Sequence, residues 1–435
     1  MQLRTKRQSR WAVFFAAAAV LICLVLPTML TAQSGSGKKV DPEVAAMIAQ
    51  LQKIQRGKNV FRFNTFGDQA FWTDGLGLDQ LVAAVSPNTA LALGLKIDAD
   101  ALTDAGVNIA SLDLNSPATT QAALQLNAVV GLKLTSDGKV GITCALCHST
   151  VDNSVTYGVG NRLDGVPNRT LQVGTIIANL PRLQPLADFL HTDVATVRTV
   201  TNSWPAGTFD ASLKFDGKAF RPDGKPASVL IPPAFGLRNR GLMTWTGWSA
   251  GFMQWNTNVA INEMGGCGKF DDDRLDDAAQ FPLAAEHHLG HVNCTPDQVS
   301  GVIDDLMAYE ETLDPPAPAT GSFDPTLAEQ GRKLFNGAAG CANCHNPGVG
   351  YTMTGYNLIK TTDPSFALLG VDTFQADRSP EHGYVVMRLG GLSTHSERLM
   401  HDGSMTMDNL LDKHGSAQAL SPDQKKALLE FLKSL

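Results

Sequence analysis

Two copies of the pentapeptide Cys-x-x-Cys-His carry the most specific chemistry in this 435-residue chain. The copies consist of Cys144, Cys147 and His148, and of Cys341, Cys344 and His345. Two thiols at this spacing can add to the vinyl groups of a porphyrin, and the following His then lies under the ring as an iron ligand. Thiols near a His could instead bind zinc. Two complete copies behind an export signal favour two covalently bound haem c groups, one for each motif.

The N-terminus has the pattern of an export signal. Four basic residues lie within residues 1–10, an apolar run covers Trp11 to Leu30, and small residues end at Ala32. This predicts a signal peptide over residues 1–32 and a periplasmic or secreted protein. The alternative is an uncleaved anchor, because the apolar run is nearly long enough to span a bilayer. The membrane would be a partner only in that case.

Charge and the remaining cysteines narrow the choice of partners. The formal net charge is −7, and loss of the basic leader leaves about −11. A strongly acidic chain disfavours nucleic acid and suits a basic redox partner protein as electron donor. Outside the motifs and the leader, only Cys267 and Cys294 remain. In an oxidising compartment these two should form a disulfide.

The chain contains an internal repeat. Residues 57–61 (GKNVF) resemble residues 331–335 (GRKLF), which lie shortly before the second motif. Residues 295–298 (TPDQ) and 421–424 (SPDQ) each place an N-cap residue and a proline before an apolar-periodic segment, which predicts a closing helix. An opening helix is predicted from Asp41, with Gly57 as its interruption or end. Each half thus has an opening helix, a motif and a closing helix.

These elements define the predicted organisation. The fold class is mainly α, with two cytochrome c-like haem domains over residues 41–313 and 323–435. A proline-rich linker over residues 314–322 joins them. Residues 62–140 are interpreted as a loop-rich insertion with short helical patches, such as residues 91–95, and this insertion enlarges the first domain. Minor β structure is also possible in that domain.

The second half resembles the C-terminal haem domain of the bacterial di-haem cytochrome c peroxidases and of the related methylamine dehydrogenase maturation enzyme. The resemblance rests on the second motif, on residues 388–392 (RLGGL) and on residues 401–404 (HDGS). In that superfamily the distal iron ligand, Met or Tyr, ends a short helix after the last stretch. His414 ends the corresponding helix here, after a count one residue shorter. The resemblance therefore implies His148, His345 and His414 as iron ligands, with Met387, Met400, Met405 and His395 as alternatives to His414.

The first half resembles the same superfamily in patches. Residues 231–237 (IPPAFGL) precede residues 245–248 (WTGW), and residues 262–265 read NEMG. The resemblance implies two catalytic residues, Trp245 between the haems and Glu263 over the peroxide-binding haem. Thr246 and Trp248 depart from the family's Asp and Arg. Core packing for the tryptophan and a surface position for the carboxylate are the ordinary alternatives. The sixth position of the first haem is either open or filled by one of His191, His287, His288 and His291.

The resulting prediction is a secreted or periplasmic peroxidase-like oxidoreductase. The C-terminal haem would pass electrons to a reactive N-terminal haem, where a small oxidant such as peroxide reacts. One alternative is a pure di-haem electron-transfer cytochrome without a substrate of its own. Another is an oxidative enzyme that acts on a partner protein.

Overall fold

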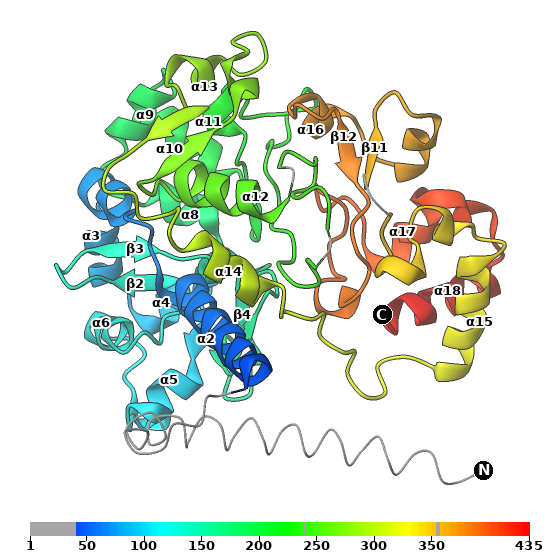
Figure 1. Cartoon of the computed structure of the whole chain (residues 1–435), viewed down its shortest axis with the longest axis horizontal. Coiled ribbons are helices and arrows are strands. Elements are labelled where there is room, and N and C mark those ends of the chain that lie inside the picture. The colour runs from blue at the N-terminus through cyan, green and yellow to red at the C-terminus, as the bar shows by residue number, and fades with distance from the viewer. Residues whose placement is uncertain (1–40, 239, 250, 354–356) are drawn as a thin grey trace. The chain divides into compact units, whose positions relative to one another are not determined.

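The computed structural model describes residues 41–238, 240–249, 251–353 and 357–435 (Figure 1). The predicted signal peptide over residues 1–32 lies outside them. Residues 53–435 form one compact unit, and residues 41–52 do not belong to it. Below, residues 53–313 are called the N-terminal half and residues 323–435 the C-terminal half. No helix among the described residues is long and apolar enough to cross a membrane.

The chain is mainly helical, as predicted, with little β structure. The helices up to the linker are α2 (Pro42–Phe63), α3 (Leu78–Ala84), α4 (Pro87–Ala92), α5 (Ala99–Asp104), α6 (Pro117–Gln125), α7 (Ala145–His148), α8 (Val173–Ala178), α9 (Gln184–Phe189), α10 (Val194–Asn202), α11 (Leu213–Asp216), α12 (Phe252–Asn258), α13 (Pro282–Glu286) and α14 (Ile303–Glu310). The C-terminal half contains α15 (Pro325–Asn336), α16 (Phe374–Asp377), α17 (Met407–Lys413) and α18 (Pro422–Lys433).

The described strands pair only in twos. The pairs are β1 (Ile97–Asp98) with β5 (Val159–Gly160), β2 (Leu132–Leu134) with β3 (Val140–Ile142), β4 (Ser149–Val151) with β6 (Arg162–Asp164), β7 (Thr208–Phe209) with β8 (Val229–Leu230), β9 (Lys269–Asp271) with β10 (His291–Asn293), and β11 (Leu358–Lys360) with β12 (Gly383–Val385). Only β1 and β5 are parallel. Sheets of this size cannot form a core by themselves, so helix packing organises the fold.

The opening and closing helices of the N-terminal half cross at a glycine. Helix α2 continues through Gly57 to Phe63, so the prediction that Gly57 interrupts or ends it is wrong. A Cβ on Gly57 would lie 1.8 Å from the carbonyl oxygen of Asp305 in α14. The glycine is therefore needed for close approach of the two backbones, and its low helix propensity is overridden by this contact. One turn later, the rings of Phe61 and Tyr309 pack edge to face at 5.6 Å.

The C-terminal half repeats the same crossing. A Cβ on Gly331 of α15 would lie 2.1 Å from the carbonyl oxygen of Ala427 in α18. The rings of Phe335 and Phe431 pack edge to face at 5.2 Å. The Gly-x-x-x-Phe repeat of the sequence is therefore one helix-crossing arrangement used twice.

The closing helices begin differently. In the C-terminal half Ser421 caps α18 in a capping box with Gln424, as the sequence predicts. In the N-terminal half α14 starts only at Ile303, so the prediction of a helix opening at residue 296 is wrong. The carboxylate of Asp297 accepts the amide hydrogens of Val299 and Ser300 and closes a local turn there instead.

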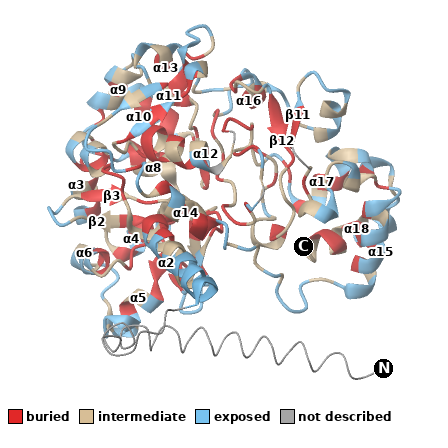
Figure 2. Cartoon of the chain, viewed as in Figure 1, coloured by how far each residue is buried: buried red, intermediate tan, exposed pale blue. Residues whose placement is uncertain are grey.

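Residues 62–140 contain short helices, as the sequence indicates, together with short strands. They form helices α3 to α6 and strands β1 to β3, and many of their apolar side chains are buried (Figure 2). These side chains share one core with residues from α8 and α10. That core includes Trp72, Leu78, Val82, Leu124, Leu132, Ile177 and Val197. The enlarged region thus builds one side of the N-terminal half.

The two halves are joined by a buried ion-pair network. The Arg378 side chain, 1% exposed, comes from the C-terminal half. Its Nε and Nη2 donate to the two carboxylate oxygens of Asp216 at 2.7 and 2.8 Å. Its Nη1 lies 3.1 Å from Asp210. Residues 314–322 contain no helix or strand, and the domain limits at 313 and 323 stay predictions.

Candidate functional site

The first motif lies on the wall of a cavity in the N-terminal half. Cys144, Cys147 and His148 line this cavity of about 210 Å³, which is called the first cavity below. Both thiols are free of disulfides. The Nδ1 atom of His148 lies 3.1 Å from the carbonyl oxygen of Pro232, so it carries the proton and leaves Nε2 free to ligate a metal. Burial lowers the pKa of His148 to about 4, which keeps the ring neutral.

The second motif brings two imidazoles close together, with an angle of 60° between the ring planes. The Nδ1 atom of His345 lies 2.9 Å from the carbonyl oxygen of Tyr351. The Nδ1 atom of His414 lies 3.1 Å from that of Leu369. Each ring therefore keeps Nε2 for a ligand, and the ring centres are 6.2 Å apart. Two imidazoles on one metal, with metal–nitrogen bonds of about 2.0 Å, have ring centres about 6 Å apart. The pair fits an iron between them.

The helix that carries His414 is where the sequence places it. Helix α17 runs from Met407 to Lys413, is capped by Thr406, and has His414 as its C-cap residue. Burial lowers the pKa of His414. The segment before α17 is one residue shorter than in the peroxidase family, but the ring of His414 still contacts that of His345.

The alternative ligands make other contacts. The sulfur of Met387 lies 2.9 Å from the guanidinium of Arg240, and Met405 is fully buried in the apolar core of the C-terminal half. Met400 packs at the edge of the same core. The Nδ1 atom of His395 lies 3.1 Å from the hydroxyl of Thr394. Of the five candidates, His414 is the one whose ring contacts the ring of His345.

An unpaired buried cation supports an anionic group near the first motif. The Nε and Nη1 atoms of Arg169 are buried without hydrogen-bond partners. Burial and the neighbouring Arg398 lower the pKa of Arg169 to about 9, and the Arg169 charge in turn disfavours protonation of His148. Haem carries two propionate carboxylates, and a guanidinium is a good partner for a carboxylate. The first motif therefore fits a haem in two ways. Its thiols and imidazole match the porphyrin and its iron, and the Arg169 charge matches a propionate.

Glu263 lies on the walls of two cavities. It lines the first cavity, and it also lines a second cavity of about 280 Å³ together with Lys214. Burial raises the pKa of Glu263 to about 7, and Lys214 opposes this shift. Burial lowers the pKa of Lys214 to about 8, opposed by Glu263. A carboxyl group with such a pKa can both take up and release a proton near neutral pH.

A wide helical turn positions Glu263. Helix α12 runs directly into a π-helical turn over Val259–Glu263, and a second π-helical turn covers Ala70–Gly75. The indole nitrogen of Trp72 donates to the carbonyl oxygen of Met264 at 2.8 Å and ties the two turns together. Turns of this kind shift side chains out of the regular helical register and are frequent at functional sites.

Trp245 connects the first cavity to the C-terminal half. Its side chain lines the cavity, and its indole nitrogen donates to the carbonyl oxygen of Leu230 at 2.6 Å. The amide nitrogen of Leu230 donates to the carbonyl oxygen of His401 at 2.7 Å. The His401 ring stacks on Tyr384 at 4.4 Å. The predicted tryptophan thus lies two hydrogen bonds from residues 401–404.

The lining of the first cavity shows which side chains could be the sixth ligand of an iron held by His148. His191, His287, His288 and His291 do not line the first cavity, whereas Met264 is on its described wall. Sequence reasoning did not single out Met264, Lys214 or Arg169. Lys214 and Arg169 lie in segments without a motif, so the sequence carries no local signal for them.

Comparisons with known proteins give slight likenesses. No family model matches the chain, and no curated protein matches it. A MauG-like protein associated with microbial copper homeostasis is 17% identical, with 52% of this chain and 81% of that one covered and a TM-score of 0.32. Hydrazine synthase of Kuenenia stuttgartiensis is 16% identical, with coverages of 52% and 86% and a TM-score of 0.26. These likenesses are too slight to assign the chain to either family.

Proposed function

We propose that this chain carries two covalent haem groups and acts as a secreted or periplasmic oxidoreductase of peroxidase type. Electrons from a donor protein enter at the C-terminal site and pass to the N-terminal site, where a small oxidant such as hydrogen peroxide reacts. The observation that carries the proposal is the difference between the two sites. His345 faces His414, whereas His148 lines a cavity that Glu263 also lines.

The chain's own residues supply the proton chemistry. A haem bound at the first motif would supply the redox chemistry, in which two electrons from the donor and two protons convert hydrogen peroxide to two waters. Glu263 takes the proton from the incoming peroxide and returns it to the leaving oxygen, because its pKa of about 7 suits both steps. Lys214 beside it favours the carboxylate form that must accept the proton first.

The second cavity gives Glu263 its own connection to solvent. The wall of this cavity also contains His191, whose side chain is 57% exposed. Solvent protons would therefore reach Glu263 through the second cavity. The apolar wall of the first cavity, which includes Leu78, Val82 and Leu132, limits the entry of water there.

Electron transfer between the halves would use the contact at Trp245. The hydrogen bonds from Trp245 to Leu230 and from Leu230 to His401 form a short bonded route between the first cavity and the C-terminal half. The backbone of Trp245 adds a second link, because its carbonyl oxygen accepts the amide hydrogen of Val385 at 2.9 Å.

The test is the reaction of the half-reduced protein with hydrogen peroxide. We expect turnover, and we expect Glu263→Gln to lower it by about 100- to 10,000-fold with little change in the haem spectra. Glu310→Gln is the matched control. Burial likewise raises the pKa of Glu310, to about 8, but its partner is Asn256, and it does not line the first cavity.

Three results would count against the proposal. A pyridine haemochrome assay that gives fewer than two haems per chain would remove its basis. Equal losses in Glu263→Gln and Glu310→Gln would exclude the assigned role of Glu263. No reaction with peroxide in any redox state, with both irons low spin throughout, would instead favour a pure electron-transfer cytochrome.

A further inference from the structure

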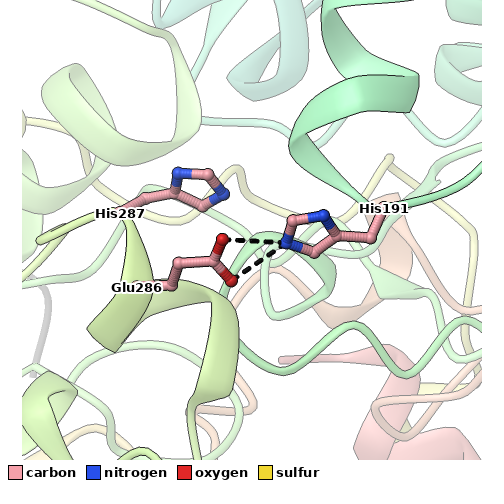
Figure 3. A group of neighbouring side chains, drawn as sticks. All are labelled: His191, Glu286 and His287. Atoms are coloured by element: carbon pink, nitrogen blue, oxygen red, sulfur yellow. Dashed lines mark hydrogen bonds and ion pairs between the residues drawn. The ribbon is translucent and has the colours of Figure 1, made fainter.

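Three metal-binding side chains meet at the surface of the N-terminal half, away from both Cys-x-x-Cys-His motifs. His191, Glu286 and His287 each offer one ligand atom, and these atoms lie within 4.8 Å of one another (Figure 3). The Nε2 atom of His191 lies 3.0 and 2.9 Å from the two carboxylate oxygens of Glu286. Figure 3 shows one ring nitrogen of His287 turned toward the same carboxylate.

The positions of these side chains are set by the ends of two helices. His191 follows α9 two residues after its last residue, Phe189. Glu286 is the last residue of α13, and His287 is its C-cap residue. The rings of Phe189 and His287 stack at 4.1 Å, which holds the two helix ends together. The C-terminal ends of helices carry partial negative charge and favour a cation.

A hydrogen bond to the backbone fixes which ring nitrogen of His287 carries the proton. Its Nε2 atom lies 3.2 Å from the carbonyl oxygen of Phe189. A carbonyl oxygen only accepts, so Nε2 carries the proton and Nδ1 keeps its lone pair. A backbone carbonyl that fixes the tautomer in this way is the usual outer partner of a metal-bound histidine.

His291 provides an internal contrast on the same surface. Its Nδ1 atom lies 3.3 Å from Asp271, and its Nε2 atom lies 2.9 Å from Asp276. The carboxylates of Asp271 and Asp276 therefore lie at different nitrogens of the His291 ring. One metal ion bound to either nitrogen could not reach both carboxylates. The two hydrogen bonds raise the pKa of His291, as expected for an ordinary ion pair.

We propose that His191, Glu286 and His287 form a binding site for a divalent transition-metal ion, with zinc as the matching ion. Two imidazoles and one carboxylate are a usual protein ligand set for zinc, with a water in the fourth position. The same set suits magnesium and calcium poorly, because these ions prefer oxygen ligands. The site does not depend on the proposed peroxidase function.

One of the three side chains, His191, also lines the second cavity. His191 is on the wall of this cavity, and Glu263 is on the same wall and also on that of the first cavity. A zinc ion at His191 would therefore lie beside a cavity that Glu263 also lines.

Equilibrium dialysis of the haem-loaded protein against zinc chloride tests the proposal, with zinc and iron per chain measured by mass spectrometry. We expect one zinc per chain that excess magnesium does not displace. His287→Phe keeps the ring that stacks on Phe189 but removes both nitrogens. His191→Asn suits the left-handed backbone of this residue, whose φ is 51°. Each variant should weaken zinc binding by more than about 100-fold, because even outer partners of metal ligands contribute about 10- to 100-fold.

The control is His291→Asn, which removes an exposed histidine from the neighbouring ion pairs. It should leave zinc binding unchanged, and all three variants should keep the wild-type haem spectra and circular dichroism. Absence of bound zinc in the wild-type protein would overturn the proposal. So would equal zinc binding by the wild type and the His191→Asn and His287→Phe double variant, or an equal loss in His291→Asn.

Discussion

Replacement of Arg378 by methionine tests how strongly the two halves are joined. Methionine keeps the length and the apolar stem of the side chain, but it leaves Asp210 and Asp216 buried without their cation. All three side chains are at most 2% exposed. Removal of one partner from a buried ion pair costs about 3–5 kcal/mol, because the remaining charge has lost both water and its partner. We expect the free energy of unfolding of Arg378→Met to fall by this amount.

The pH dependence of this loss has a definite sign. Burial raises the pKa of Asp210 to about 7, and Arg378 opposes the shift. Without Arg378 the folded-state pKa rises further above the unfolded value of about 4. The folded variant then binds more protons than the unfolded chain does, so its stability falls as the pH rises. The difference between the wild type and the variant should be small at pH 5 and largest near pH 8.

Urea unfolding followed by far-ultraviolet circular dichroism measures both effects. The matched control is Arg332→Met, because Arg332 pairs with Glu329 on the surface, where both side chains are about half exposed. Exposed pairs contribute at most about 1 kcal/mol. Asp210→Asn combined with Asp216→Asn in the Arg378→Met background should recover much of the loss. A loss no larger than that of Arg332→Met, or the same loss at pH 5 and pH 8, would refute a buried network.

Three further predictions concern the candidate site and its surroundings. His414→Ala should convert the proposed C-terminal haem from low to high spin and raise its reduction potential, and His395→Ala should do neither. Redox titration followed by absorbance measures both effects, and an unchanged spectrum in His414→Ala would indicate another ligand. The rate of the peroxide reaction should rise through about pH 7 as Glu263 becomes a carboxylate able to accept a proton; a rise that survives in Glu263→Gln would assign the titration to another group. The disulfide joins Cys267 and Cys294, which are 27 positions apart, so its loss through alanine substitution should lower the free energy of unfolding by about 3–4 kcal/mol. Alkylation of both thiols without reduction would contradict the disulfide.

Features set by short sequence patterns could be predicted. The disulfide between Cys267 and Cys294, the capping of α18 by Ser421 and the extent of α17 before His414 are confirmed. Each depends on residues within a few positions of one another or on the simple pairing of the remaining thiols. The placement of Glu263 and Trp245 on one cavity followed from resemblance rather than from local rules, and their catalytic roles stay predictions.

Features set by distant residues could not be predicted. Arg378 and Asp216 are 162 positions apart, and Lys214 meets the backbone of Asn262 across 48 positions. No periodicity links such pairs. Gly57 misled the helix assignment for the same reason, since the carbonyl group of Asp305 that requires a glycine there lies in a different helix.

The repeated glycine crossing suggests how the two halves came to differ. A tandem duplication of one ancestral unit would leave one crossing in each half, at Gly57 and at Gly331. In the second copy five residues separate Phe335 from Cys341, whereas in the first copy residues 62–143 fill the corresponding interval between Phe61 and Cys144. Growth at this point leaves the helix crossing untouched. One half can thus be enlarged at this point while the other stays small, and both halves keep the same helix crossing.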